Sequence, residues 1–214
     1  QILHEFAQAA RALEDGNSHY VLALLGRIRT IMKVCVTQVD ILETMTPLQF
    51  NSFRSYLSSS SGFQSAQFRK VEAALGRRDE RMAGHLPPAM QEEIRAITSS
   101  RSIWDSFLVY VNGRGHSIPD SVLNRDPSIA YESSADVQEA LLSLHRNDPE
   151  GALVAERLVD IDEGIQEWRY RHVKMVERTI GAKMGTGGSS GVQYLASTLF
   201  NPVFKDLWEI RSRF

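Results

Sequence analysis

Two long runs of apolar residues with helical spacing constrain the fold of this 214-residue chain more than any other feature. In each run the apolar side chains recur every three or four residues, so they share one face of an α-helix. Helices of this length are typical of helical bundles, and no segment alternates as a half-buried β-strand does. We therefore predict an all-α helical bundle with long core helices. The two faces consist of Val21, Leu24, Leu25, Ile28, Ile31, Met32, Cys35, Val39 and Leu42, and of Val154, Leu158, Ile161, Ile165, Trp168, His172, Met175 and Thr179.

Shorter helices are predicted around the two long ones. Thr46-Pro47-Leu48-Gln49 has the pattern of a helix start, with Thr46 as the cap and Gln49 completing a capping box. Residues 112–133 are rich in glycine and proline and are predicted to be a long irregular excursion. Helices are expected over residues 2–13, 64–75, 89–98, 103–111, 135–145 and 149–180.

Composition excludes several classes of protein. The 24 Lys and Arg residues are balanced by 26 Asp and Glu residues, so no basic field favours nucleic acid or anionic lipid. The single Cys35 excludes an internal disulfide and a C-x-x-C metal site. No membrane-spanning run or signal peptide is apparent. We expect residues 1–214 to form a single cytoplasmic domain. Because Gln1-Ile2-Leu3 is already in helical register without a cap, we also expect this domain to be N-terminally incomplete.

His172 is the first candidate for chemistry, because it occupies an otherwise apolar helix face. A buried imidazole is costly unless it is hydrogen-bonded or bound to a metal. An ordinary hydrogen-bonded core histidine therefore remains one interpretation. The other is a metal or heme ligand, since bundle cores often hold such cofactors. No second ligand lies four residues away, and a heme requires only one proximal histidine.

The Gly/Ser-rich segment at residues 185–191 is the second candidate. It follows the predicted His172 helix directly and lacks the spacing of a phosphate-binding P-loop. A flexible linker is one interpretation. A structured loop whose backbone approaches a ligand is the other, because glycine tolerates such geometry and apolar sequence resumes at Val192.

Phe50, Phe53 and Arg54 form the third candidate, since helical spacing places all three on one face. Two aromatic rings beside a guanidinium suit a small aromatic carboxylate. An amphipathic helix with a surface arginine is the alternative. The other histidines offer no pattern of this kind, and His116 and His145 are expected to be solvated.

The motifs around these candidates resemble the tryptophan 2,3-dioxygenase family. The resemblance lies in the runs Leu42-Glu43-Thr44-Met45-Thr46-Pro47, Phe50-x-x-Phe53-Arg54, Ser61-Gly62-Phe63-Gln64-Ser65-x-Gln67-Phe68-Arg69, Arg171-His172-x-x-Met175-Val176-x-Arg178-x-Ile180-Gly181 and Lys183-x-Gly185-Thr186-Gly187-Gly188-Ser189-Ser190-Gly191. It covers most of the chain and is weak across about residues 77–150.

The resemblance implies a helical heme b enzyme, usually a homotetramer. Such an enzyme inserts both atoms of O2 across the indole C2–C3 bond of L-tryptophan and forms N-formyl-L-kynurenine. The segment after the heme-ligand helix would then be an active-site loop. His172 matches the proximal iron ligand, and Ser61 and Gly62 match residues on the distal side of the heme. Arg54 matches the substrate carboxylate clamp, Phe50 an aromatic contact to the substrate, and Thr186 a contact to its amino-acid end.

Two departures leave the activity open at this stage. The family's distal histidine belongs to an N-terminal block that ends just before the sequence corresponding to Gln1-Ile2-Leu3, so no catalytic residue is assigned. Ser58-Ser59 also stands where the family often has a proline. A related heme-dependent monooxygenase of a tryptophan- or tyrosine-like substrate, or a non-catalytic helical oligomerisation module, therefore remains an alternative.

Overall fold

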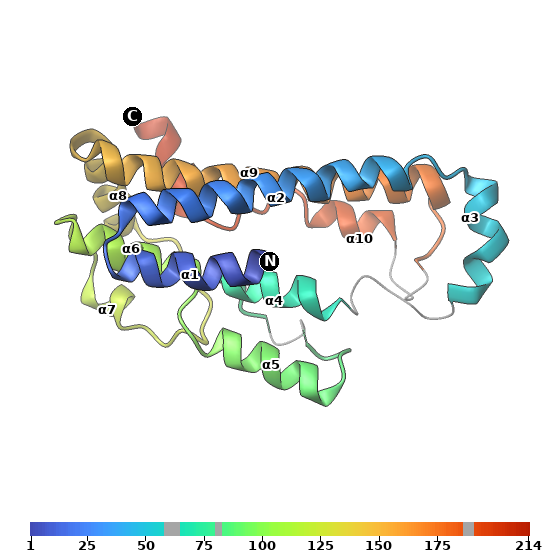
Figure 1. The fold of residues 1–214 in the computed structure, drawn as a ribbon, viewed down its shortest axis with the longest axis horizontal. Helices are drawn as coiled ribbons and strands as arrows, with labels where there is room; N and C mark the ends of the chain where they lie inside the picture. The colour runs from blue at the N-terminus through green and yellow to red at the C-terminus, as the bar shows by residue number, and fades with distance from the viewer. Residues whose placement is uncertain (58–64, 80–82, 186–190) are drawn as a thin grey trace.

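A computed structural model describes residues 1–57, 65–79, 83–185 and 191–214. The described residues form helices and connecting segments with no β-strand, so the all-α prediction is confirmed (Figure 1). The helices are α1 (Ile2–Glu14), α2 (Ser18–Leu42), α3 (Pro47–Arg54), α4 (Ala66–Leu75), α5 (Pro88–Thr98), α6 (Ile103–Gly113), α7 (Asp120–Leu123), α8 (Ala135–Asn147), α9 (Pro149–Ile180), α10 (Val192–Ser197) and α11 (Lys205–Glu209). Among the described residues there are also the short 3-10 helices η1 (Ser55–Leu57) and η4 (Ile210–Arg213).

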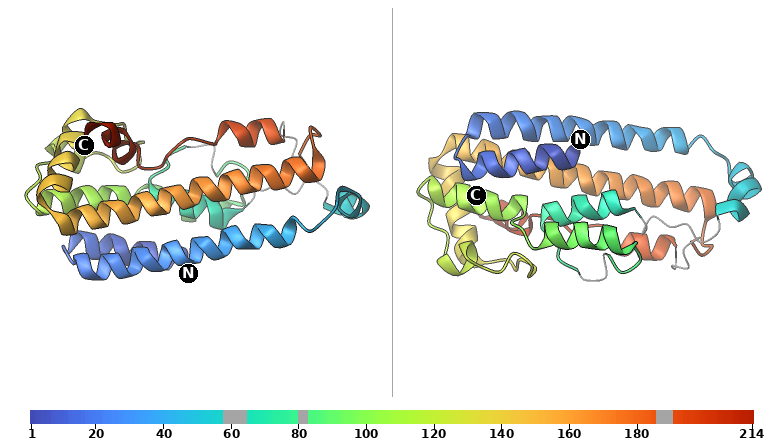
Figure 2. Two further views of the ribbon diagram at one scale, coloured as in Figure 1. Left: turned by 90° about the horizontal axis from the view of Figure 1, so that it is seen from above. Right: turned by 60° about the horizontal axis from the view of Figure 1, so that its bottom comes forward.

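The two long helices α2 and α9 lie side by side and make the most extensive helix contact in the described chain (Figure 2). Two ion pairs show that the helices are parallel. Arg29 of α2 pairs with Asp160 of α9, and further along both helices Asp40 pairs with Arg171. In the first half of α9 the apolar face is fully buried, at Val154, Leu158 and Ile161. The predicted apolar face of α2 is buried only in part, because Leu42 at the C-terminal end of the helix is 50% exposed.

Local capping fixes where several helices begin and end. Thr46 accepts a hydrogen bond from the Gln49 amide while the Gln49 side chain accepts one from the Thr46 amide, so the predicted capping box is confirmed. Gly76 ends α4 with φ +115°, a left-handed conformation that glycine adopts without penalty. The predicted irregular excursion contains the short helix α7, which its glycine and proline content did not indicate.

The C-terminal segment is fastened to α9 by the buried carboxylate of Asp162. This carboxylate accepts hydrogen bonds from the backbone amides of Val203 and Phe204 at 2.9 Å and from the Trp208 indole at 2.9 Å. A carboxylate buried without such donors would carry a large desolvation penalty. Asp162 therefore fixes the path of the chain before α11.

Two charged groups stabilise the start of α9. Asp148 caps the helix by accepting a hydrogen bond from the Gly151 amide at 3.0 Å. The Arg114 guanidinium donates to both carboxylate oxygens of Asp148, and the hydrogen bond to Oδ1 is 2.7 Å long. Hydrogen bonding to Arg114, opposed in part by burial, lowers the pKa of Asp148 to about 2.

Replacement of Asp148 with asparagine should change how stability depends on pH. Because the folded-state pKa is below that of the unfolded chain, the ionised carboxylate contributes fully above about pH 4, and the contribution disappears as the pH falls through about 2. Asp148→Asn should lose about 2 kcal/mol at pH 7, with the gap to the parent chain closing toward pH 2.

Urea unfolding at a series of pH values measures this effect. Asp136→Asn, which removes an exposed carboxylate at the start of α8, is the control and should leave the pH profile of the parent chain in place. A gap between Asp148→Asn and the parent chain that stays constant from pH 7 to pH 2 would contradict the assignment.

Candidate active site

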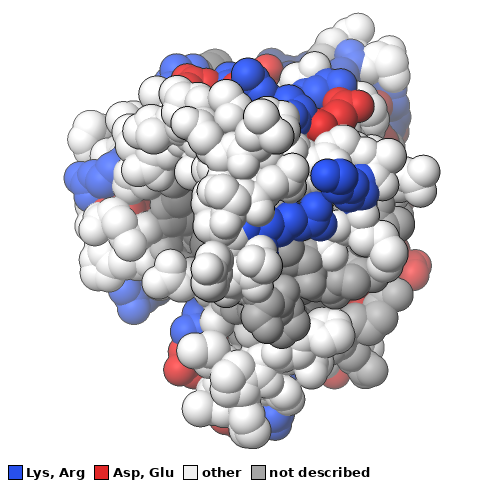
Figure 3. Space-filling model, turned by 90° about the vertical axis from the view of Figure 1, so that its right-hand side faces the viewer, with Lys and Arg blue, Asp and Glu red and all other residues white. Residues whose placement is uncertain are grey.

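The described candidate residues come from α3, the last third of α9 and the segment that follows α9. These elements meet at the end of the molecule that carries α3 (Figure 1). Arg54 Nη2 on α3 donates a 2.6 Å hydrogen bond to the carbonyl oxygen of Met184, which lies in the segment that follows α9. Viewed from outside, Lys and Arg side chains cross the middle of this face among uncharged ones (Figure 3). Cations are therefore exposed at this end of the molecule.

The α3 helix carries the predicted aromatic residues and the predicted cation. The two rings contact each other as expected for one helix face, but the guanidinium points to a backbone carbonyl. Phe50 and Phe53 are in edge-to-face contact, with ring centroids 5.3 Å apart and an interplanar angle of 77°. The Arg54 guanidinium reaches the Met184 carbonyl instead of a ring in the described part of the chain. No residue of α3 is buried, so these side chains remain accessible to a ligand.

His172 lies eight residues before the end of α9 and is partly buried. Its ring is parallel to the Trp168 indole, with centroids 5.3 Å apart and an interplanar angle of 3°. Burial lowers the pKa of His172, so the imidazole is neutral at neutral pH. Within the described chain, neither ring nitrogen has a hydrogen-bond partner, so the ordinary hydrogen-bonded core histidine is not what the structure shows.

A neutral imidazole with an uncommitted nitrogen is the form that binds a metal. No group of three or more His, Cys, Asp or Glu side chains suited to a metal ion occurs among the described residues. A single such histidine can hold a prosthetic group that is bound through one imidazole nitrogen.

Ion pairs hold the last third of α9 against the end of α2. Arg171 donates to Asp40 and, at 3.0 Å, to Glu43, while Arg178 lies 3.4 Å from Glu43. Glu43 thus joins the helix of His172 to the segment that leads into α3. Sequence reasoning assigned Glu43 and Arg171 no role, although both belong to the motif runs that carried the family resemblance.

Three predicted site residues are outside the described part of the chain. Ser61 and Gly62 fall between η1 and α4, and Thr186 falls between α9 and α10. Their assignments as cofactor and substrate contacts stay predictions.

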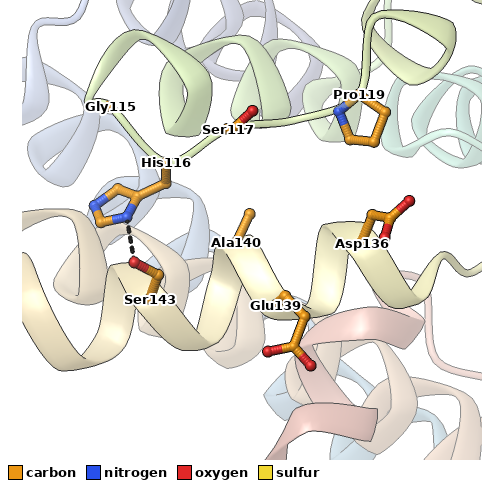
Figure 4. A pocket seen from close by; sticks show the side chains of 8 residues that line it. All are labelled: Gly115, His116, Ser117, Pro119, Asp136, Glu139, Ala140 and Ser143. Atoms are coloured by element: carbon orange, nitrogen blue, oxygen red, sulfur yellow. Dashed lines mark hydrogen bonds between the residues drawn. The ribbon is translucent and has the colours of Figure 1, made fainter.

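The prediction that His116 and His145 are solvated was wrong. Their side chains are only 9% and 10% exposed. His116 Nδ1 lies 3.0 Å from Ser143 Oγ beside an open pocket of about 430 Å³ between the segment after α6 and helix α8 (Figure 4). His145 packs edge-on against Phe214. His116 is covered because the segment that carries it packs against α8, and His145 because the C-terminus packs against it; helical spacing reveals neither contact.

Comparison with known proteins identifies the family. The sequence model described as tryptophan 2,3-dioxygenase matches residues 1–86 and 145–214. The chain belongs to the tryptophan 2,3-dioxygenase family. It is 52% identical over 214 residues to the tryptophan 2,3-dioxygenase of Anaeromyxobacter sp. (strain K), covering 99% of this chain and 80% of that protein. It is 47% identical over 213 residues to that of Herpetosiphon aurantiacus, covering 99% and 82% of the two chains.

The tryptophan 2,3-dioxygenase match divides the molecule into two parts. Its two segments contain all of α1 to α4 and α9 to α11, and hence every predicted site residue. Most of the chain from α5 to α8, including the pocket beside His116, lies between them. This gap agrees with the weak resemblance across residues 77–150.

Gly191 should be needed to join the Gly/Ser-rich segment to α10. Its φ is +62°, and a Cβ atom there would lie 2.8 Å from the Lys183 carbonyl oxygen. Gly191→Ala would add backbone strain and this close contact, together about 1–3 kcal/mol. We expect amide hydrogen exchange in α10 to accelerate at least about tenfold.

Gly181→Ala is a matched control for this prediction. Gly181 has a similar φ of +59°, but a Cβ atom added there would have nothing within 4 Å of it. The variant should therefore carry backbone strain without the contact to Lys183 and leave exchange in α10 unchanged. Equal protection of α10 in both variants and the parent chain would contradict the proposed role of Gly191.

Proposed function

We propose that this chain is a heme-dependent tryptophan 2,3-dioxygenase that catalyses the first step of L-tryptophan catabolism. The reaction inserts both atoms of O2 across the indole C2–C3 bond and gives N-formyl-L-kynurenine. Membership in the tryptophan 2,3-dioxygenase family, over nearly the whole chain, is the observation that carries the proposal. The partly buried, neutral and uncommitted imidazole of His172 supports it independently.

His172 is the residue that would hold heme b, and the residues present fit that group. One histidine is sufficient to hold a heme, and His172 offers a partly buried, neutral imidazole with an uncommitted nitrogen. When bound, the heme supplies the O2 chemistry, which protein side chains alone do not provide. Ser61 and Gly62 are proposed as further contacts of the cofactor.

Arg54 is the proposed clamp for the substrate carboxylate. Its guanidinium already donates to the Met184 carbonyl, so it can exchange a neutral acceptor for a charged one when the substrate binds. Phe50 supplies an aromatic surface for the indole, and Thr186 would contact the amino-acid end of the substrate. Fixing both ends of L-tryptophan holds the indole C2–C3 bond in one position, which lowers the entropic cost of the reaction.

The stoichiometry needs no further reductant. Cleavage of the C2–C3 bond with a carbonyl formed at each carbon removes four electrons from the substrate, and O2 accepts four. The chain therefore needs only to bind L-tryptophan and O2 and to exclude competing reactions.

We further propose a homotetrameric, cytoplasmic enzyme in which residues 1–214 belong to a single heme-binding catalytic domain. Exposed apolar side chains gather where α2 leads into α3, with Ile41 at 70%, Leu48 at 82% and Tyr56 at 85% exposure. Such a cluster is typical of a surface that another subunit covers. Among the described helices, none is long and apolar enough to cross a membrane.

Loss of the His172 imidazole should abolish heme binding. The purified chain mixed with hemin should give a Soret band that shifts with L-tryptophan, and reduction followed by air should yield a product heavier than L-tryptophan by two oxygen atoms. His172→Ala should lack the Soret band, whereas His19→Ala, at an exposed position of α2, should retain it. Normal heme stoichiometry in His172→Ala would exclude His172 as the ligand, and a product with one added oxygen would indicate a monooxygenase.

Removal of the Arg54 guanidinium should weaken the binding of substrates that carry a carboxylate. We expect Arg54→Ala to raise KM for L-tryptophan by about 30-fold or more, since charge-assisted pairs contribute about 2–4 kcal/mol. Tryptamine, which lacks the carboxylate, provides the matched comparison: its binding, measured from the Soret shift, should be nearly the same in the parent chain and in Arg54→Ala. An equal loss of affinity for both compounds would show that Arg54 maintains the fold of α3 and not the carboxylate contact.

A further inference from the structure

The orientation of the His172 ring is the feature that the proposed function leaves unexplained. The torsion that rotates an imidazole about its Cβ–Cγ bond is soft, so a ligating histidine needs a neighbour that fixes its ring plane. Metal-binding histidines are usually fixed by a hydrogen bond from the second ring nitrogen to a carboxylate or carbonyl. In the described part of this chain, no such protein acceptor meets His172.

The Trp168 indole is the group that contacts the ring. The two residues are four positions apart on α9, so their side chains lie on the same helix face. Their rings are parallel within 3°, with centroids 5.3 Å apart, which is an offset-stacked arrangement. Because the two ring planes are parallel, rotation of the imidazole out of its plane would lose this contact.

Trp168 is in turn supported from a different helix. The Phe68 ring of α4 packs on the indole, with centroids 5.2 Å apart and an interplanar angle of 33°. The Arg69 guanidinium lies 5.6 Å from the centroid of the Phe68 ring. The indole of Trp168 therefore contacts both His172 and a residue of α4, so it is supported by a second helix as well as by its own.

We infer that Trp168 is a positioning residue that fixes the ring plane of His172 by stacking, in place of a hydrogen bond donated by the second ring nitrogen. The inference rests on the proposed function, in that His172 is taken as the heme ligand. The stack itself exists in the heme-free chain and can be tested there.

The first test uses the heme-free protein. The carbon-bound ring protons of His172, assigned by their absence in His172→Ala, should be shifted upfield by the indole ring current. Trp168→Leu should move them toward the values of an unstacked histidine, whereas Trp168→Phe should retain much of the shift. Tyr170→Leu is the control, because Tyr170 is an aromatic residue of α9 that is 50% exposed. Identical His172 signals in the parent chain and Trp168→Leu would overturn the inference.

The second test uses the hemin-loaded protein. Trp168→Leu should broaden the ferric electron paramagnetic resonance signal and shift the ferrous iron–histidine stretching band, because the imidazole samples several orientations. Transfer of heme to apomyoglobin should accelerate about fivefold, the size expected for loss of one aromatic pair. Trp168→Phe should restore both spectra. A Trp168→Leu protein with the spectra and the transfer rate of the parent chain would overturn the inference.

The outcomes separate this inference from the proposed function. A parent chain that binds no hemin, or a His172→Ala variant that binds it normally, contradicts the proposed function. The ring-proton shifts of His172 in the heme-free protein then still test whether Trp168 stacks on His172. If Trp168→Leu does not fold, Phe68→Leu retains the indole and removes its support, and it should produce the same spectral changes to a smaller extent. Unchanged proton shifts and spectra in Phe68→Leu would then overturn the inference.

Discussion

Burial of one face of α9 against α2 is the constraint on which the rest of the structure depends. At 1.5 Å per residue, the 32 residues of α9 extend for about 48 Å. The apolar face is fully buried at Val154, Leu158 and Ile161 and becomes partly buried at Trp168 and His172. One continuous helix thus passes from the core into the candidate site, so its packing in the core determines where His172 lies.

Buried carboxylates complete what apolar packing begins. Asp162 binds the amides of Val203 and Phe204, and Asp206 accepts hydrogen bonds from Tyr131 and, at 2.9 Å, from Gln138. Each carboxylate is buried with donors from segments distant in sequence, so its desolvation is compensated only when those segments are in place. The C-terminal segment therefore adopts one path although its helices α11 and η4 are too short to be stable alone.

The sequence was sufficient to predict whatever depends on local spacing. Helical periodicity indicated the two long helices α2 and α9, the cap at Thr46 marked the start of α3, and the predicted end at residue 75 is the end of α4. Contacts between distant segments were not predictable in this way. Trp168 was recognised as part of an apolar face, but its stacking partner Phe68 lies a hundred residues away. The burial of His116 and His145 likewise depends on segments that fold back over them.

The contrasting environments of His172 and Arg54 follow from the cost of burying each group. A neutral imidazole costs less to desolvate than a charged group, and burial itself keeps it neutral, so His172 can lie on the partly buried face of α9. A guanidinium stays charged at any accessible pH and is expensive to bury without an anion. Arg54 accordingly lies on α3, which has no buried residue, and donates to a backbone carbonyl. A substrate carboxylate would supply the missing countercharge, so desolvation of Arg54 becomes favourable only when that substrate is bound.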